Sequence, residues 1–309
     1  MPQARRDPAV IILTAFLLMA AASGLRAAKA EGAAAAPSEG LVVMTFNIRN
    51  GNANDGPNAW PLRKEMVAST IFFHEAAIVG MQEVLRGQID DLERLLPGYG
   101  WFGVGRDDGR DGGEFGPIFY ARGRFRLLEQ ATFWLSATPD VPGSRGWDGA
   151  CNRIVTWGKF AEIATGRTFY VFNTHFDHLG TTARRESAAL LLRKIVEIAG
   201  TGPAVVTGDF NCASSDEPYR ILTAGVDGGA ALVDARTISG RPPYGGSLSF
   251  NGFGSVTGAG SIIDHVFVRG GIAAARSGVI AEKWDGRFAS DHYPVLAEIR
   301  FEPPAGPIR

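Results

Sequence analysis

The chain has 309 residues, of which 45% are hydrophobic and 20% are charged, and its formal net charge is −1 at pH 7. This composition is typical of a folded globular protein with ample material for a core, and it excludes a disordered or fibrous chain. Lysine and arginine form no long run after residue 30, which argues against a protein that holds a long nucleic-acid duplex through its phosphates.

The N-terminal segment has the pattern of a secretory signal. Arg5 and Arg6 precede an apolar stretch at 10–22, and the small residues around 28–30 fit a cleavage site. The apolar stretch is short for a membrane span, and an uncleaved N-terminal anchor is the alternative. We therefore expect an exported protein, periplasmic or secreted, with a signal peptide at 1–30, a flexible leader at 31–40 and one domain at 41–302.

The chain contains two cysteines, Cys151 and Cys212, whose spacing matches no metal-binding signature. In an exported protein they either form a disulfide or remain two thiols, and the sequence leaves both alternatives open.

Beyond the leader, short apolar runs alternate with turns, and four segments have helical character. The clearest helix covers 183–199, where apolar residues recur at three- and four-residue spacing on one face. The other helices are expected at 60–74, 88–96 and 217–222. Strands are expected at 41–46, 77–81, 99–104, 116–121, 125–135, 152–163, 168–173, 204–207, 248–250, 262–268, 279–280 and 295–301. Because helices fall between strands, we expect an α/β fold in which a pair of packed sheets is covered by helices on the outer faces.

Several expected strands end in polar side chains. One apolar run begins at Ala204, breaks at Gly208 and then presents Asp209 and Asn211, two residues apart. Residues two apart on an extended backbone point to the same face, so both side chains leave the strand end together. Polar residues follow or interrupt other apolar runs in the same way, at Asn47, Glu83, His175, Asp264, Asp291 and His292. Each alone is common in a turn or cap, but together they indicate one polar site at the rim of the sheets.

The residue types at these strand ends favour a hard metal ion. Carboxylate and amide oxygens suit a divalent cation such as Mg²⁺, and Asn47, Glu83 and Asp291 are the candidate ligands. The histidines are too few and the cysteines wrongly placed to favour zinc. Two histidines near several aspartates indicate an acid–base or charge-stabilising pair whose rings are oriented by carboxylates.

Six sequence blocks resemble, in the same order, the motifs of the endonuclease/exonuclease/phosphatase superfamily, also called the DNase I-like fold. These blocks are Thr45-Phe46-Asn47-Ile48-Arg49, Gly80-Met81-Gln82-Glu83-Val84, Asn173-Thr174-His175, Gly208-Asp209-Phe210-Asn211, Ile263-Asp264-His265-Val266-Phe267 and Ser290-Asp291-His292-Tyr293-Pro294. The resemblance extends over 41–300. It implies an α/β (α+β) four-layer sandwich, in which two packed mixed β-sheets are flanked by helices, and phosphoester hydrolysis assisted by Mg²⁺ or Mn²⁺.

The resemblance also implies a role for each residue. Glu83 resembles the principal metal ligand, with Asn47 and Asp291 beside it. Asp209 resembles the carboxylate that positions or deprotonates water or handles the leaving group, and Asn211 resembles a donor to the phosphoryl oxygens. The remaining matches are His292 as an acid–base or charge-stabilising group oriented by Asp264, His175 as a phosphate-binding histidine, and Arg153 and Tyr120 as substrate-binding residues.

Two blocks, at 133–136 and 173–178, are most similar to the branch that contains nocturnin and deadenylase-type nucleases. This similarity implies a phosphodiesterase or phosphatase that acts on a small or single-stranded substrate such as RNA or a nucleotide. We expect the protein to be a monomer. A sphingomyelinase-like lipid phosphodiesterase and a non-catalytic binding protein with the same fold are the alternatives. The intact set of polar strand-end residues argues against the binding protein, and phosphate scavenging outside the cytoplasm fits the export signal.

Overall fold

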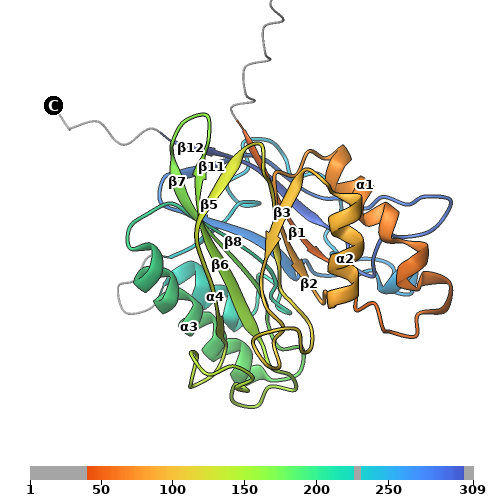
Figure 1. The fold of residues 1–309 in the computed structure, drawn as a ribbon, viewed down its shortest axis with the longest axis horizontal. Coiled ribbons are helices and arrows are strands. Elements are labelled where there is room, and N and C mark those ends of the chain that lie inside the picture. Colours follow the sequence, from red (N-terminus) through yellow and green to blue (C-terminus); the bar gives the residue numbers. More distant parts are fainter. Residues whose placement is uncertain (1–39, 226–230, 303–309) are drawn as a thin grey trace, which may run out of the picture. The chain divides into compact units, whose positions relative to one another are not determined.

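Two mixed β-sheets, each of six strands, form the centre of the protein in the computed structural model, which describes residues 40–225 and 231–302 (Figure 1). The first sheet has the order β11 (Ile272–Val279), β12 (Val295–Phe301), β1 (Leu41–Asn47), β2 (Ile78–Gln82), β4 (Ile118–Ala121) and β3 (Tyr99–Phe102). The second has the order β5 (Phe125–Trp134), β6 (Ile154–Glu162), β7 (Thr168–His175), β8 (Ala204–Asp209), β10 (Asp264–Arg269) and β9 (Val233–Asp234).

The helices cover the two outer faces, so the expected four-layer sandwich is confirmed. Helices α1 (Lys64–Phe73) and α2 (Arg86–Leu95) pack on the first sheet through an apolar cluster that includes Phe46 and Met81. Helices α3 (Thr181–Ala199) and α4 (Glu217–Ala224) pack on the second sheet through a cluster that includes Phe172 and Phe267. A third cluster fills the space between the sheets. Figure 1 shows α1 and α2 beside one sheet and α3 and α4 beside the other.

Parallel strand pairs at the centre of each sheet bring the predicted polar ends together. β1 runs parallel to β2 and places Asn47 opposite Gln82, whereas β7 runs parallel to β8 and places His175 opposite Asp209. β10 runs antiparallel to β8, so its first residue, Asp264, also lies opposite Asp209. The ends of strands from distant parts of the chain therefore share one rim of the sandwich.

Three predicted elements differ from the structure, and one short strand was not predicted. The segment at 248–250 forms an isolated bridge between Phe250 and His292 in place of a strand, and 279–280 proves to be the end of the eight-residue strand β11. β11 contains three alanines and a register shift after Ala274, so its sequence shows little of the alternation that marks a strand. The two-residue strand β9 was not expected at all. The helix predicted at 60–74 is divided, because Trp60–Leu62 forms a 3₁₀ turn containing a proline before α1 begins.

The predicted signal peptide (1–30) and nearly all of the leader (31–40) lie outside the described residues. Within 40–225 and 231–302, no helix is both long enough and apolar enough to cross a membrane. Cys151 and Cys212 are both free thiols, and Cys212 is buried.

Candidate active site

A cleft of about 620 Å³ lies at the rim where the polar strand ends meet. Most of the predicted site residues line it together: Glu83, Arg153, His175, Asp209, Asn211, Asp291 and His292. Asn47 and Asp264 lie behind this lining and hydrogen-bond to members of it.

Asn47 connects the two sheets at the floor of the cleft. Its side-chain nitrogen lies 3.1 Å from Oε1 of Glu83 and 3.0 Å from Oδ2 of Asp209, while its oxygen accepts a hydrogen bond from the backbone of Arg49. The side chain is fully buried. Because it donates to one carboxylate from each sheet, Asn47 fixes the spacing between Glu83 and Asp209.

Glu83 and Asp291 form an acidic pair from opposite ends of the sequence. The backbone of Asn50 donates to the second oxygen of Glu83, and Ser290 donates to Asp291. Burial raises the pKa of Asp291, the charge of His292 lowers it, and the nearby negative charge of Glu83 raises it. Arg49, whose Nε lies 3.7 Å from Oδ2 of Asp291, offsets part of this repulsion. Two repelling carboxylates at a cleft fit a hard divalent cation, which would replace this repulsion by attraction.

Asp209, Asp264 and His292 make a second close group, with candidate ligand atoms within 4.8 Å of one another. Nδ1 of His292 lies 2.9 Å from Oδ2 of Asp264, and its Nε2 lies 3.7 Å from Oδ2 of Asp209. Burial disfavours the imidazolium, but the charges of Asp264 and Asp209 outweigh burial and raise the pKa of His292 to about 10. Burial and the charge of Asp264 raise the pKa of Asp209 to about 7. The spacing suits a metal ion, whereas a protonated His292 suits charge stabilisation instead.

His175 and Asn211 border Asp209 from the β7 and β8 ends. Nε2 of His175 lies 3.4 Å from Oδ2 of Asp209. Burial and the charge of Arg153 hold the pKa of His175 well below its ordinary value, so its ring is neutral. The backbone of Asn211 donates to Oδ1 of Asp209 at 3.0 Å, and its side chain donates to the carbonyl of Phe176. These contacts fix the orientation of the Asp209 carboxylate.

Arg153 presents two buried nitrogens, Nε and Nη1, that make no hydrogen bond among the described residues. The residue is 6% exposed, and Nη2 is its one nitrogen with a hydrogen bond, 3.1 Å long, to Nδ1 of His178. The neighbouring Arg106 also has an unpartnered buried Nε, although its Nη1 contacts Glu114 at 2.5 Å. Unpartnered guanidinium donors are costly to bury, so this part of the cleft is suited to an anion.

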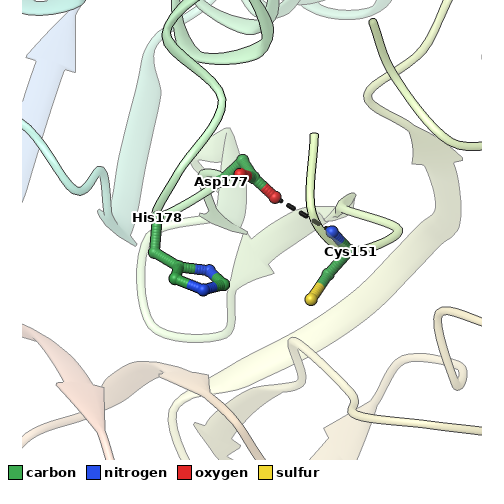
Figure 2. Close-up of side chains that lie close together, drawn as sticks. All are labelled: Cys151, Asp177 and His178. Atoms are coloured by element: carbon green, nitrogen blue, oxygen red, sulfur yellow. Dashed lines mark hydrogen bonds between the residues drawn. The ribbon is translucent and has the colours of Figure 1, made fainter. Parts of the chain in front are cut away.

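Cys151, Asp177 and His178 lie close together, as Figure 2 shows. The backbone of Cys151 donates to Asp177 at 3.1 Å, and Nε of Arg153 lies 3.6 Å from the same carboxylate oxygen. Since the guanidinium already contacts both Asp177 and His178, it takes the place that a metal ion would need. We therefore assign no metal to this group.

The structure contradicts the prediction that Tyr120 contacts substrate. Tyr120 pairs with Ile78, at the start of β2, whereas the cleft lies beyond the other end of that strand. Its ring packs against Phe102 and Phe160 in the core between the sheets. The substrate-binding role was implied only by the family resemblance, whereas the strand register decides which end of the sheet Tyr120 occupies.

Sequence reasoning missed several residues of the cleft. Arg106 and Glu114 come from a charged, glycine-rich loop that resembles a solvated turn. Phe250 is the last residue of the strand predicted at 248–250, and Phe253 follows it. The fully buried Arg63 was also missed, because arginine on a surface helix normally faces water. For Arg106 and Glu114, the charged loop between two strands of one sheet is the feature of the sequence that could have indicated a functional role.

Left-handed backbone conformations gather at this cleft. Among the described residues, seven non-glycine residues have a positive φ. Four of them line the cleft: Arg49, Glu83, Asn211 and Phe253. Such conformations cost free energy and are typical of sites where function requires them.

The two-sheet fold and the polar cleft at its rim agree with a family of phosphoester hydrolases. The chain belongs to the endonuclease/exonuclease/phosphatase family, whose model matches residues 44–292. A family member of known structure from Bacteroides vulgatus is 42% identical, with a TM-score of 0.81 over 85% of this chain and 99% of that one.

Two further relatives are a phosphatase and nocturnin. The Bacteroides thetaiotaomicron mannosyl-6-phosphatase is 38% identical, with a TM-score of 0.78 over 84% of this chain and 100% of that chain. Drosophila melanogaster nocturnin is 26% identical over 237 residues, which is 67% of this chain. The chain spans 35% of that nocturnin and 59% of an uncharacterised mimivirus protein that it also matches.

Proposed function

We propose that this protein is a divalent-cation-dependent phosphatase that hydrolyses phosphomonoesters of small molecules. The observation that carries the proposal is a group of buried guanidinium nitrogens that make no hydrogen bond, Nη1 and Nε of Arg153 and Nε of the neighbouring Arg106; of these, Nε of Arg153 also lies 3.6 Å from Asp177. A terminal phosphate has three oxygens and about two negative charges, and guanidinium groups bind such an anion through paired hydrogen bonds. The phosphatase of 38% identity supports a monoester.

Glu83 and Asp291 are the residues we assign to a Mg²⁺ or Mn²⁺ ion, with Asn47 fixing the position of Glu83. When bound, such an ion neutralises phosphoryl charge and makes bound water more acidic. The carboxylate of Asp209, which Asn211 and Asn47 orient, accepts a proton from the attacking water.

His292 and Arg153 stabilise the charge that develops on the phosphoryl group. Asp264 fixes the ring of His292 through Nδ1, which directs Nε2 toward Asp209 and the space where the phosphoryl group binds. Donors that are already fixed need no reorganisation during the reaction, and this is the main source of their effect on rate. The signal peptide predicted at 1–30 supports action outside the cytoplasm, which fractionation of the producing cells tests.

The test measures hydrolysis of 4-nitrophenyl phosphate and bis(4-nitrophenyl) phosphate by the purified protein, with Mg²⁺, Mn²⁺ or EDTA. We expect cation-dependent turnover with a kcat/KM at least ten times higher for the monoester. Arg153→Ala should lower the monoester kcat/KM by about 10- to 100-fold, as for loss of a charge-assisted hydrogen bond. Arg126→Ala removes an exposed arginine of β5 and is the matched control.

Preference for the diester in the wild-type protein would overturn the monoester proposal in favour of the nuclease-like alternative. Turnover that survives EDTA would overturn the proposed dependence on a cation.

A further inference from the structure

Two phenylalanines, Phe250 and Phe253, form an aromatic surface in the cleft that holds the polar strand ends. Phe250 is 37% exposed, and its ring centroid lies 5.0 Å from that of His292. Phe253 is half-buried and lines the same cleft. Both come from one short segment, and neither takes part in the chemistry assigned above.

The backbone that carries Phe253 is held in an unusual conformation. Gly252, Phe253 and Gly254 have φ values of 54°, 55° and 91°, so three successive residues lie in the left-handed region. Glycine adopts this region freely, whereas phenylalanine does so at a cost of about 1 kcal/mol or more. Position 253 therefore carries a phenyl ring although its backbone conformation favours glycine. The same holds for the side chains of Glu83 and Asn211 at this cleft.

Contacts with the catalytic segment fix this turn in place. The backbone amides of Asn251 and Gly252 donate to the carbonyl of Asp291 at 2.7 and 3.0 Å. The guanidinium of buried Arg63 lies 5.7 Å from the centroid of Phe253 and donates to the carbonyl of Ala289 at 3.1 Å. Because the turn is bonded to Asp291 and the Phe253 ring contacts an arginine that is itself bonded to Ala289, the aromatic surface keeps its position relative to Asp291 and His292.

We propose that Phe250 and Phe253 bind the organic part of the substrate, and that this part is a sugar ring. The proposal rests on the phosphatase function above. A hexopyranose has an apolar C–H face that packs on phenyl rings, and its hydroxyl groups need polar partners. Asn50, Asp55 and Glu114 line the same cleft. Each already makes a hydrogen bond within the protein, and the remaining lone pairs of their oxygens can accept from a hydroxyl group. An acyclic phosphate ester would leave both rings largely uncovered.

The experiment compares kcat/KM for mannose 6-phosphate, adenosine 5′-monophosphate and glycerol 3-phosphate in the wild-type protein, Phe253→Gly and Phe250→Leu. Phe253→Gly removes the ring and retains a residue that tolerates a positive φ, so the turn should still form. Phe250→Leu keeps an apolar side chain without an aromatic face. Phe73→Ala, an exposed phenylalanine of α1, is the matched control. Thermal unfolding shows that each variant is folded.

We expect each cleft variant to lower kcat/KM for mannose 6-phosphate by at least tenfold, and by at least five times more than for glycerol 3-phosphate. Equal losses on these two substrates, or none, would overturn the inference while the phosphatase function stands. A larger loss on adenosine 5′-monophosphate would replace the sugar by a nucleobase. If the wild-type protein hydrolyses no monoester, the proposed function itself fails, and this inference fails with it.

Discussion

The side-chain nitrogen of Gln82 lies 2.7 Å from the side-chain oxygen of Asn173, and this buried hydrogen bond joins the two sheets just before their polar ends. Thr207 donates to the same oxygen at 3.0 Å, and the nitrogen of Asn173 donates to the carbonyl of Met81. Gln82 precedes Glu83, and Asn173 lies two residues before His175. The polar connection therefore sets the distance between the strand ends that form the site.

This connection depends on the absence of a side chain at Gly80. A Cβ there would lie 2.0 Å from Oγ1 of Thr207 and 2.4 Å from Oδ1 of Asn173. We predict that Gly80→Ala lowers the free energy of unfolding by about 2–4 kcal/mol, because overpacking and lost buried hydrogen bonds add. Urea denaturation measures the change. Gly87→Ala, on the exposed side of α2 with no atom within 4 Å of the new Cβ, should be neutral or stabilising. Equal stability of the two variants would contradict this account.

Replacement of the acidic pair tests the metal assignment. We predict that Glu83→Gln and Asp291→Asn each weaken Mg²⁺ binding at least tenfold in isothermal titration calorimetry, because each removes a charged oxygen ligand. The exposed Glu65→Gln on α1 is the control and should bind as the wild type does. Unchanged affinity in both acidic-pair variants, with loss in Asp209→Asn, would move the ion to the group of Asp209, Asp264 and His292.

Asp264 acts through His292, so its replacement should affect turnover more than binding. We predict that Asp264→Asn lowers kcat by about 100-fold, within the range for a lost acid–base or charge-stabilising function, and changes KM less than threefold. Steady-state kinetics at saturating Mg²⁺ give both constants. Asp285→Asn, at an exposed aspartate, is the control. A rise in KM with an unchanged kcat would show that Asp264 serves substrate binding instead.

Asp177 should make the free energy of unfolding depend on pH in the acidic range. Burial acts to raise the pKa of Asp177, but hydrogen bonds from the backbone of Gly180, Leu179 and Cys151 lower it well below the ordinary value. A depressed pKa stabilises the fold above the unfolded value near pH 4, and this stabilisation is lost as pH falls below it. Asp177→Asn should therefore cost about 1.5–3 kcal/mol at pH 7 and less toward pH 3. Urea denaturation at several pH values measures the difference, and a cost independent of pH would contradict the prediction.

Chain order and local pattern determined most of the elements. The apolar runs that become β1, β2, β7 and β8 end at their polar residues because each buried strand emerges at the rim. Six short blocks sufficed to indicate the family and its four-layer architecture, since their residue types suit one reaction at one rim. The predictions were wrong where the local signal is weak, as in β11, whose small residues and register shift hide its alternation.

Only the tertiary structure decided which residues meet. The family resemblance implied a substrate-binding role for both Tyr120 and Arg153, yet the fold packs Tyr120 against the core between the sheets and places Arg153 in the cleft. Arg63 is buried because the carbonyls of Ile48, Arg49 and Ala289 converge on it from distant segments. Such convergence has no local signature. Burial, register and unpartnered donors are properties of the packed chain, whereas the pattern of apolar runs and polar ends is already present in the sequence.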